Sequence, residues 1–201
     1  MSDVNAETRV TPIGRCEWAK IIKPDKKWNS EGTYSIDLIL PEAEAVPLLE
    51  EARQAIAVEV ERTKAEHPDK EINYSHTSPF KKFNDEGESS YRIKFKQDAE
   101  VTPKGKEPYH VDISVFDADG KEWDENVMIG NDSKVCISYR IYCWDVAVQG
   151  GIGITLKLRA VQVVNLVEYE RDARSFGFKN EGEVSANGSS STSKPLSDIP
   201  F

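Results

Sequence analysis

The chain has 201 residues, of which 38% are apolar and 30% are charged, a composition typical of a folded, polar domain. No apolar run approaches the roughly 20 residues that span a bilayer, and no basic-then-apolar leader opens the chain, so we expect an intracellular protein. The net charge is −9, from 26 basic and 35 acidic residues, which argues against a uniformly basic coat for nucleic acids. Any contact with a polyanion must therefore depend on a local basic surface.

The first part of the chain predicts an arm and two strands. Residues 1–13 show no periodicity and are expected to form a flexible arm. Residues 14–23 alternate weakly between apolar and polar types, and residues 33–40 alternate clearly, so both segments predict strands. The loop between them, residues 24–32, is polar and carries lysines and Trp28.

Residues 42–66 predict the one long helix, because they are rich in Glu and Ala and carry apolar residues at an imperfect helical period. Glu42 and Glu44 lie near the positive end of its dipole, where acidic side chains are stabilising. We expect the helix to end at His67, because a residue that precedes a proline avoids the helical region. The residues that carry the expected helical period are Val46, Leu49, Ala52, Arg53, Ile56, Val58 and Val60.

The rest of the chain predicts strands separated by loops. Residues 69–89 are expected to form a long loop. Residues 91–97, 109–116, 134–148 and 152–167 each alternate in the way that a half-buried strand does. One helix among five or six strands predicts a mainly β fold, an OB-fold-like antiparallel barrel with one inserted helix.

The expected domain organisation is one barrel domain followed by a tail. The barrel is expected over residues 1–167, with the helical insertion at about 42–67. Residues 168–201 are expected to form a flexible, disordered C-terminal tail, because a stretch rich in Ser, Asn and Gly buries too little apolar surface to offset its ordering entropy. The last six residues, 196–201, place a Phe and the terminal carboxylate at the end of this tether. Such a tip suits docking into a pocket of another protein.

Basic and aromatic residues are grouped at four places in this acidic chain. Alternation puts Arg92, Lys94 and Lys96 on one strand face, where they would follow a phosphate backbone, although a solvated strand face explains them equally well. Arg140 lies on an outer strand face beside two aromatic residues, the combination that stacks on single-stranded bases. The alternative for Trp144 is packing under the helix or a loop. The candidate nucleic-acid contacts are Lys20, Lys23, Trp28, Lys81, Lys82, Phe83, Arg92, Lys94, Lys96, Arg140, Tyr142 and Trp144.

Other motifs give weaker indications of chemistry. The turn that begins at Asp117 starts like a calcium loop, but its twelfth position is Met128 instead of Glu, so a hairpin turn is the better interpretation. Asp112, Asp117 and Asp119 leave open a metal-dependent nuclease as an alternative function. A protein-interaction β-domain without a nucleic-acid role is a third interpretation. The three cysteines have no metal-ligand spacing and are expected to be reduced thiols. We therefore expect no catalytic residue, no metal and no cofactor.

A longer pattern, spread over residues 17–169, resembles the single-stranded DNA-binding proteins of short-tailed, podovirus-type bacteriophages. The resemblance implies an OB fold and sequence-independent binding of single-stranded DNA by a non-enzymatic protein. It also implies protection and annealing of strands during phage DNA replication and recombination in the host cell cytoplasm. The resemblance also implies that Tyr142 and Trp144 stack on bases, and Lys157 joins the candidate contacts. The stretches that carry the pattern are Trp18 to Asp25, Gly32 to Leu38, Pro79-Phe80, Tyr91 to Lys96, Ile129 to Val135, Tyr142 to Trp144, Ala147-Val148 and Leu156 to Leu158.

The C-terminal tip resembles that of the bacterial single-stranded DNA-binding proteins, which recruits replication and repair enzymes. The residues expected to bind partners are Asp198, Ile199, Pro200 and Phe201. The expected partners are single-stranded DNA, replication proteins such as a DNA polymerase or a primase-helicase, and host proteins that read the bacterial tail. We expect no membrane contact, and a homodimer is left open. The tail carries six acidic and four basic residues, whereas the phage family has a densely acidic tail, so we interpret the tip as a host docking signal borrowed by a phage protein.

Overall fold

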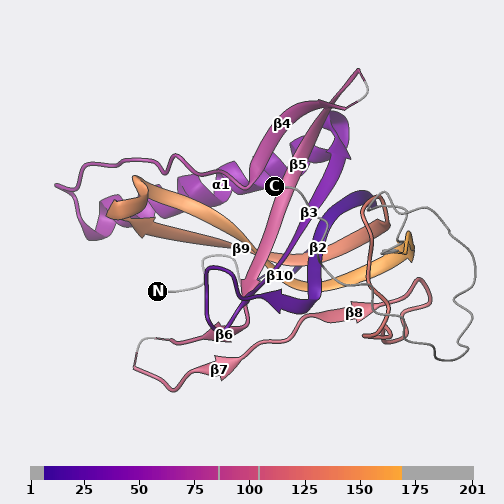
Figure 1. The fold of residues 1–201 in the computed structure, drawn as a ribbon. Helices are drawn as coiled ribbons and strands as arrows, with labels where there is room; N and C mark the ends of the chain where they lie inside the picture. The colour runs from indigo at the N-terminus through magenta and orange to yellow at the C-terminus, as the bar shows by residue number, and fades with distance from the viewer. Residues whose placement is uncertain (1–6, 86, 104, 169–201) are drawn as a thin grey trace, which may run out of the picture. The chain divides into compact units, whose positions relative to one another are not determined.

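The computed structural model describes residues 7–85, 87–103 and 105–168 (Figure 1). The described part of the chain contains no helix whose length and apolar content would suit a bilayer crossing. The elements in chain order are β1 (Arg9–Val10), β2 (Gly14–Asp25), β3 (Thr33–Pro41), α1 (Glu42–Glu66), β4 (Phe80–Asp85), β5 (Glu88–Asp98), β6 (Glu100–Val101), β7 (Tyr109–His110), β8 (Ser114–Phe116), β9 (Lys134–Val146), the 3-10 helix η1 (Ala147–Gln149) and β10 (Gly151–Asn165).

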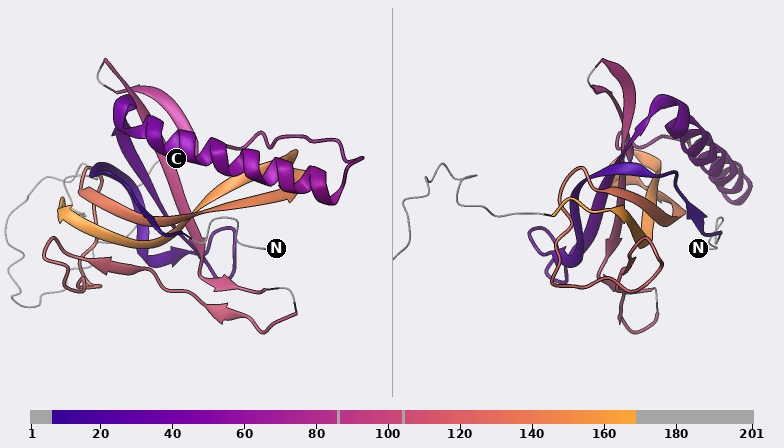
Figure 2. Two further views of the ribbon diagram at one scale, coloured as in Figure 1. Left: turned by 180° about the vertical axis from the view of Figure 1, so that it is seen from behind. Right: turned by 90° about the vertical axis from the view of Figure 1, so that its right-hand side faces the viewer.

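Five strands close a ring in the order β2, β3, β5, β10, β9 and back to β2. This ring confirms the predicted mainly β, OB-fold-like barrel. The expectation that it is antiparallel throughout was wrong, because β10 and β5 run parallel where Leu156 pairs with Phe95. A ring with an odd number of strands cannot alternate direction at every joint, so at least one pair must be parallel. Figures 1 and 2 show β9 and β10 as a long hairpin beside the crossing strands β2, β3 and β5.

The core fills the inside of this ring with alternate residues of each strand. Ile36 and Leu38 of β3 and Ile93 and Phe95 of β5 are fully buried, as their alternation predicts. The Phe95 ring packs edge-on against the Tyr139 ring of β9, with ring centroids 5.2 Å apart and an interplanar angle of 68°. Burying each large apolar side chain stabilises the fold by about 1.5–3 kcal/mol.

Helix α1 has the predicted bounds but a different buried face. Val46 and Val58 are 38% and 47% exposed, so the predicted apolar stripe was wrong at these positions. Figure 2 shows α1 running along the β9–β10 hairpin, and it also contacts β3 and β5. Small side chains allow the helix to approach the sheet closely. The packing gained in this way outweighs the burial that the larger apolar residues on the solvent side would have contributed. The residues buried on α1 are Ala45, Leu48, Ala52, Ala55, Glu59 and Thr63.

Three other segments differ from the sequence prediction. The end of the predicted arm pairs with β9 through β1, and Thr11 is buried where its backbone N–H donates to the Ile137 carbonyl at 3.0 Å. Residues 80–85 of the predicted loop form β4 on the edge of β5, because backbone pairing does not require clean alternation. The predicted strand at 109–116 is two short strands, of which only β8 pairs with the barrel. The predicted disordered tail, residues 168–201, lies outside the described residues except for Glu168, which forms a bridge with Ile129.

Candidate nucleic-acid interface

One row of outward-facing side chains crosses all five barrel strands. The strand register places Lys157 between Arg140 on one neighbouring strand and Lys96 on the other. Lys96 also pairs with Ser35, and Ser35 pairs with Lys20. We call Arg140, Lys157, Lys96, Ser35 and Lys20 the basic row. Four inter-strand steps of about 4.8 Å make it about 19 Å long, a length that suits a polyanionic chain lying across the strands.

A bulge in β2 aligns Lys20 with this row. Cys16 and Ile21 are both buried, so the alternation of β2 slips by one residue between them. The register with β3 shifts between Glu17 and Lys20, and Trp18 has a φ of 49°. Bulges of this kind favour Gly in the left-handed position, and the conformation costs another residue on the order of 1–2 kcal/mol. The bulge explains why the alternation of this strand is weak in the sequence.

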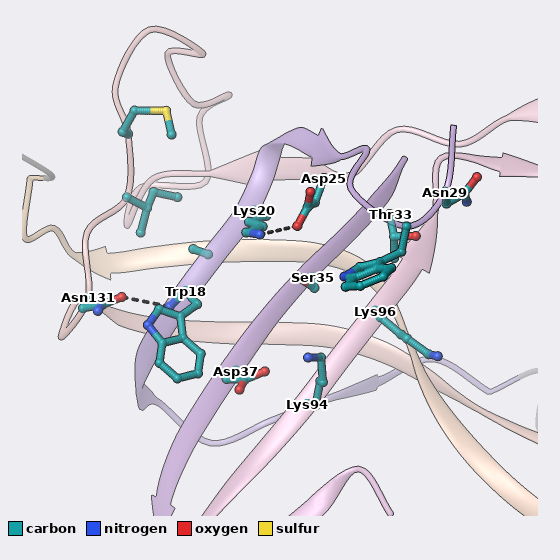
Figure 3. A pocket seen from close by; sticks show the side chains of 14 residues that line it. Trp18, Lys20, Asp25, Asn29, Thr33, Ser35, Asp37, Lys94, Lys96 and Asn131 are labelled. Atoms are coloured by element: carbon teal, nitrogen blue, oxygen red, sulfur yellow. Dashed lines mark hydrogen bonds and ion pairs between the residues drawn. The ribbon is translucent and has the colours of Figure 1, made fainter. Parts of the chain in front are cut away.

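The basic row borders a hollow of about 850 Å³ over β2, β3 and β5. Lys20, Lys94 and Lys96 line it together with Trp18 and Trp28. In the view of Figure 3, Trp18 and Lys96 lie on opposite sides of this first hollow with Lys94 between them. Trp28 is 89% exposed, and the Lys20 ammonium forms an ion pair with Asp25. The first hollow therefore offers ammonium groups and indole rings on one open surface.

A second hollow, of about 330 Å³, meets the first at Lys96. Its lining includes Tyr142, Thr155 and Lys157. The Lys157 ammonium lies 4.0 Å from the centroid of the Tyr142 ring, so one ring face is bound to a cation. Register pairs Tyr142 with Thr155, and this places the ring on the outer face of the hairpin as the sequence predicts. The two hollows together form a surface that runs along the basic row.

Arg92 is engaged within the protein beside the first hollow. Its guanidinium carbon lies 5.3 Å from the Trp18 ring centroid and 5.2 Å from the Phe83 ring centroid. Arg92 Nη2 donates to Glu17 Oε2 at 2.7 Å. The backbone N–H of Trp18 donates to Asn131 Oδ1 at 2.8 Å. The predicted basic strip along β5 is thus divided, because Lys94 and Lys96 are exposed while the charge of Arg92 is held by Glu17.

An acidic residue lies under the cationic surface of the first hollow. Asp37 is only 7% exposed, and it pairs in register with Lys94. Burial raises the pKa of the Asp37 carboxyl, although the positive charges of Lys94 and Arg92 act in the opposite direction. The ionised carboxylate offsets part of the positive charge that Lys94 presents to the first hollow.

Residues 13–166 match the family model described as "Single-stranded DNA-binding protein, Bacteriophage T7". The chain belongs to this phage protein family. The single-stranded DNA-binding protein of Escherichia phage T7 is 29% identical over 204 residues, covering 91% of this chain and 87% of the relative. That of Enterobacteria phage T3 is 30% identical over 188 residues, covering 84% of this chain and 80% of the relative. These matches confirm the resemblance to phage single-stranded DNA-binding proteins.

Solved structures show the same fold. The crystal structure of gp2.5, a single-stranded DNA-binding protein encoded by bacteriophage T7, has a TM-score of 0.65 and 27% identity, and the match covers 83% of this chain and 96% of that chain. The single-stranded DNA-binding protein of bacteriophage Enc34 in complex with single-stranded DNA has a TM-score of 0.56. Its identity is 15%, with coverage of 84% and 94%, so this second likeness concerns the fold alone.

Trp144, a predicted stacking residue of the family pattern, packs across β10. Its indole Nε1 donates to Thr155 Oγ1 at 3.2 Å. A Cβ atom added at Gly153 would lie 2.5 Å from Trp144 Cη2, so the ring covers the glycine that faces it in register. The Ser75 side chain also approaches this glycine. Trp144 therefore packs in part against its own hairpin near the Ser75 loop, in line with the alternative that it packs under a loop.

The remaining predicted contacts lie outside the linings of the two hollows. Lys82 pairs with Glu42 at 2.5 Å, and this pairing raises the pKa of Lys82. Arg140 Nε donates to Thr8 Oγ1 at 3.3 Å, which places this end of the basic row against the chain's own N-terminal segment. The predicted residues absent from both linings are Lys23, Lys81, Lys82, Phe83, Arg92, Arg140 and Trp144.

The three aspartates of the nuclease alternative have structural partners, and that of Asp119 is the Lys121 ammonium at 3.9 Å. Asp112 accepts a hydrogen bond from the Tyr34 hydroxyl at 3.3 Å. Asp117 Oδ1 accepts from the backbone N–H groups of Asp119 and Lys121 at 2.9 and 2.8 Å, and it thereby closes the predicted hairpin turn. Within the described ranges, no three Asp, Glu, His or Cys side chains gather in a way that suits a metal ion.

All three cysteines are free thiols. Burial raises the pKa of Cys16 and of Cys143 to about 11, and it also raises the pKa of Cys136. A thiol with a raised pKa holds its proton near neutral pH and is a poor nucleophile or ligand. This agrees with the reduced thiols that the sequence predicts.

Sequence reasoning missed three residues of the interface, Trp18, Ser35 and Asp37. The apolar residues Cys16 and Ile21 could have indicated the bulge that exposes Trp18, because their five-residue spacing breaks strand alternation. No signal in the sequence points to the other two, because their importance depends on the strands beside them.

Proposed function

We propose that this chain binds single-stranded DNA without regard to base sequence. The observation that carries the proposal is the basic row, which crosses the barrel where Lys96 joins the two hollows. Phosphates attract such a row through charge neutralisation and counterion release. The printed names of the T7 and T3 relatives, which are single-stranded DNA-binding proteins, support the same conclusion.

The groups on this surface recognise features that every nucleotide has. Lys20, Lys96 and Lys157 neutralise phosphates, which carry no base identity. Tyr142 stacks on a base face, a contact that tolerates any base. A duplex hides its base faces inside the stack, so the aromatic contacts favour a single strand.

A titration of fluorescently labelled oligo-dT and of a matched duplex tests this proposal at two salt concentrations. We expect tight binding of the single strand, weaker binding of the duplex, and weaker affinity at the higher salt concentration, together with quenching of tryptophan fluorescence. Absence of single-strand binding at low salt would overturn the proposed function, and the family membership would then concern the fold alone.

We further propose that residues 1–167 form the DNA-binding domain and that the tail recruits partners through residues 196–201. In this role the protein protects and anneals strands during phage DNA replication and recombination in the host cell cytoplasm. The tip recruits replication proteins such as a DNA polymerase or a primase-helicase. Its resemblance to the bacterial tip supports this, and the tip lies outside the described residues.

Deletion of residues 196–201 tests the recruiting role separately from DNA binding. We expect unchanged or higher affinity for oligo-dT and loss of replication support. The matching binding experiment uses a labelled peptide with the sequence of the tip and the host proteins that read the bacterial tail. A peptide that binds none of them, or a clear loss of DNA affinity on deletion, would contradict this role.

A further inference from the structure

We propose that Trp18 forms a second nucleobase-stacking site, at the side of the first hollow away from Lys96. The inference rests on the proposed binding of single-stranded DNA and assigns a residue outside the predicted set of contacts. Trp18 is 60% exposed and lines the first hollow. Figure 3 shows its indole on the other side of Lys94 and Asp37 from Lys96. A strand that follows the surface from Tyr142 past Lys96 therefore reaches this ring.

The backbone conformation of Trp18 has an unfavourable energy for any residue other than Gly, and the fold keeps the indole ring in place despite it. A φ of 49° within a bulge favours Gly, yet the largest side chain occupies it. Non-Gly residues in strained backbone conformations cluster at active sites and ligand-binding sites. The hydrogen bond from the Trp18 N–H to Asn131 Oδ1 holds the bulge in this conformation.

Arg92 is the positioning residue for this site. Its guanidinium lies near both the Trp18 ring and the Phe83 ring, and Glu17 fixes it by an ion pair. The side chains of Arg92 and Glu17 are 26% and 15% exposed, so the pair lies largely below the surface that DNA contacts. Arg92 thus supports the indole from one side, and the exposed part of the ring is available to a base.

The test compares Trp18→Gly, Trp18→Ala and Trp18→Phe in the full chain, with Tyr74→Ala as a control. Tyr74 is 58% exposed, a fraction close to that of Trp18, and it lines neither hollow. We expect Trp18→Gly to bind oligo-dT at least about fivefold more weakly, the lower bound for loss of one base stack. Trp18→Phe, which keeps a ring, retains most of the affinity. Because Gly suits the left-handed backbone, Trp18→Gly melts at or above the temperature of Trp18→Ala.

The positioning role is tested by a double variant, Glu17→Gln with Arg92→Met. We expect weaker affinity, because the Trp18 ring loses its support. Removing both members of the ion pair leaves the net charge unchanged, so we expect the same dependence of affinity on salt. A slope of log affinity against log salt that falls by about 0.7 would identify Arg92 as a phosphate contact and overturn this role. Wild-type affinity in a folded Trp18→Gly protein would refute the stacking site and leave the proposed function intact. Failure of the wild-type chain to bind oligo-dT would refute both.

Discussion

Replacing Tyr142 by Ala tests the contact that both the sequence and the geometry favour. The ring lies on the outer face of β9, with the Lys157 ammonium 4.0 Å from its centroid. Loss of one base stack removes on the order of 1–3 kcal/mol of binding free energy, which corresponds to about fivefold to 150-fold weaker affinity. The cation–π contact is worth about 0.5–1 kcal/mol of folding free energy at such a site. A domain with the usual stability of about 5–15 kcal/mol stays folded after that loss.

The assay is fluorescence anisotropy with labelled oligo-dT, paired with urea unfolding of each variant. Tyr142→Phe is the matched control, because it keeps a stacking ring and the contact with Lys157, and we expect it to bind within about twofold of the wild type. Since no charge is removed, the salt dependence of Tyr142→Ala is expected to equal that of the wild type. A folded Tyr142→Ala protein with unchanged affinity would remove Tyr142 from the interface.

Three further predictions concern charge, packing and pH. Replacing Lys96 by Met is expected to lower the salt slope of single-strand binding by about 0.7. The control Lys121→Met changes a side chain that is 77% exposed and lines neither hollow, and it is expected to leave the slope unchanged. Equal slopes for both variants would exclude Lys96 as a phosphate contact. Gly153→Ala is expected to displace the Trp144 indole and to lower the free energy of unfolding by about 1–3 kcal/mol through overpacking, seen as a shift in tryptophan emission and in the urea midpoint; an unchanged midpoint would contradict the close packing. Burial raises the pKa of the Asp37 carboxyl in the folded state, so the folded protein holds this proton more tightly than the unfolded chain does. The stability that the protonated group contributes is therefore complete below about pH 4, the ordinary aspartate range. It declines as pH rises through the folded-state pKa. Asp37→Asn is therefore expected to be more stable than the wild type at pH 7 and equally stable below pH 4, and to bind DNA more tightly at pH 7; lower stability at pH 7 would show that the carboxylate is favoured by Lys94 and Arg92 more than it is penalised by burial.

Much of the fold was predictable because its signals are local. The alternation of residues 33–40 and 91–97 identifies two barrel strands and their buried faces, since successive strand side chains point to opposite sides. Helix α1 begins and ends where Pro41 and His67-Pro68 indicate. Apart from Ala52, its buried face was not predictable, because close approach to β9 and β10 selects small residues such as Ala45 and Ala55 over the larger valines. Strands β1 and β4 were missed for a related reason, since edge pairing depends on backbone groups and not on a side-chain pattern.

The interface divides between sequence and tertiary structure in the same way. By itself the sequence determined that Lys94, Lys96, Arg140 and Tyr142 point away from the core, because alternation assigns a face to each residue of a strand. Which of these side chains become neighbours was decided only by the register of five strands far apart in the chain. That register, together with the β2 bulge that turns Lys20 outward, joins Lys20, Lys96, Lys157 and Arg140 into one row across the barrel. A side chain's face is a property of its own strand, whereas a basic row across strands exists only once the ring has closed.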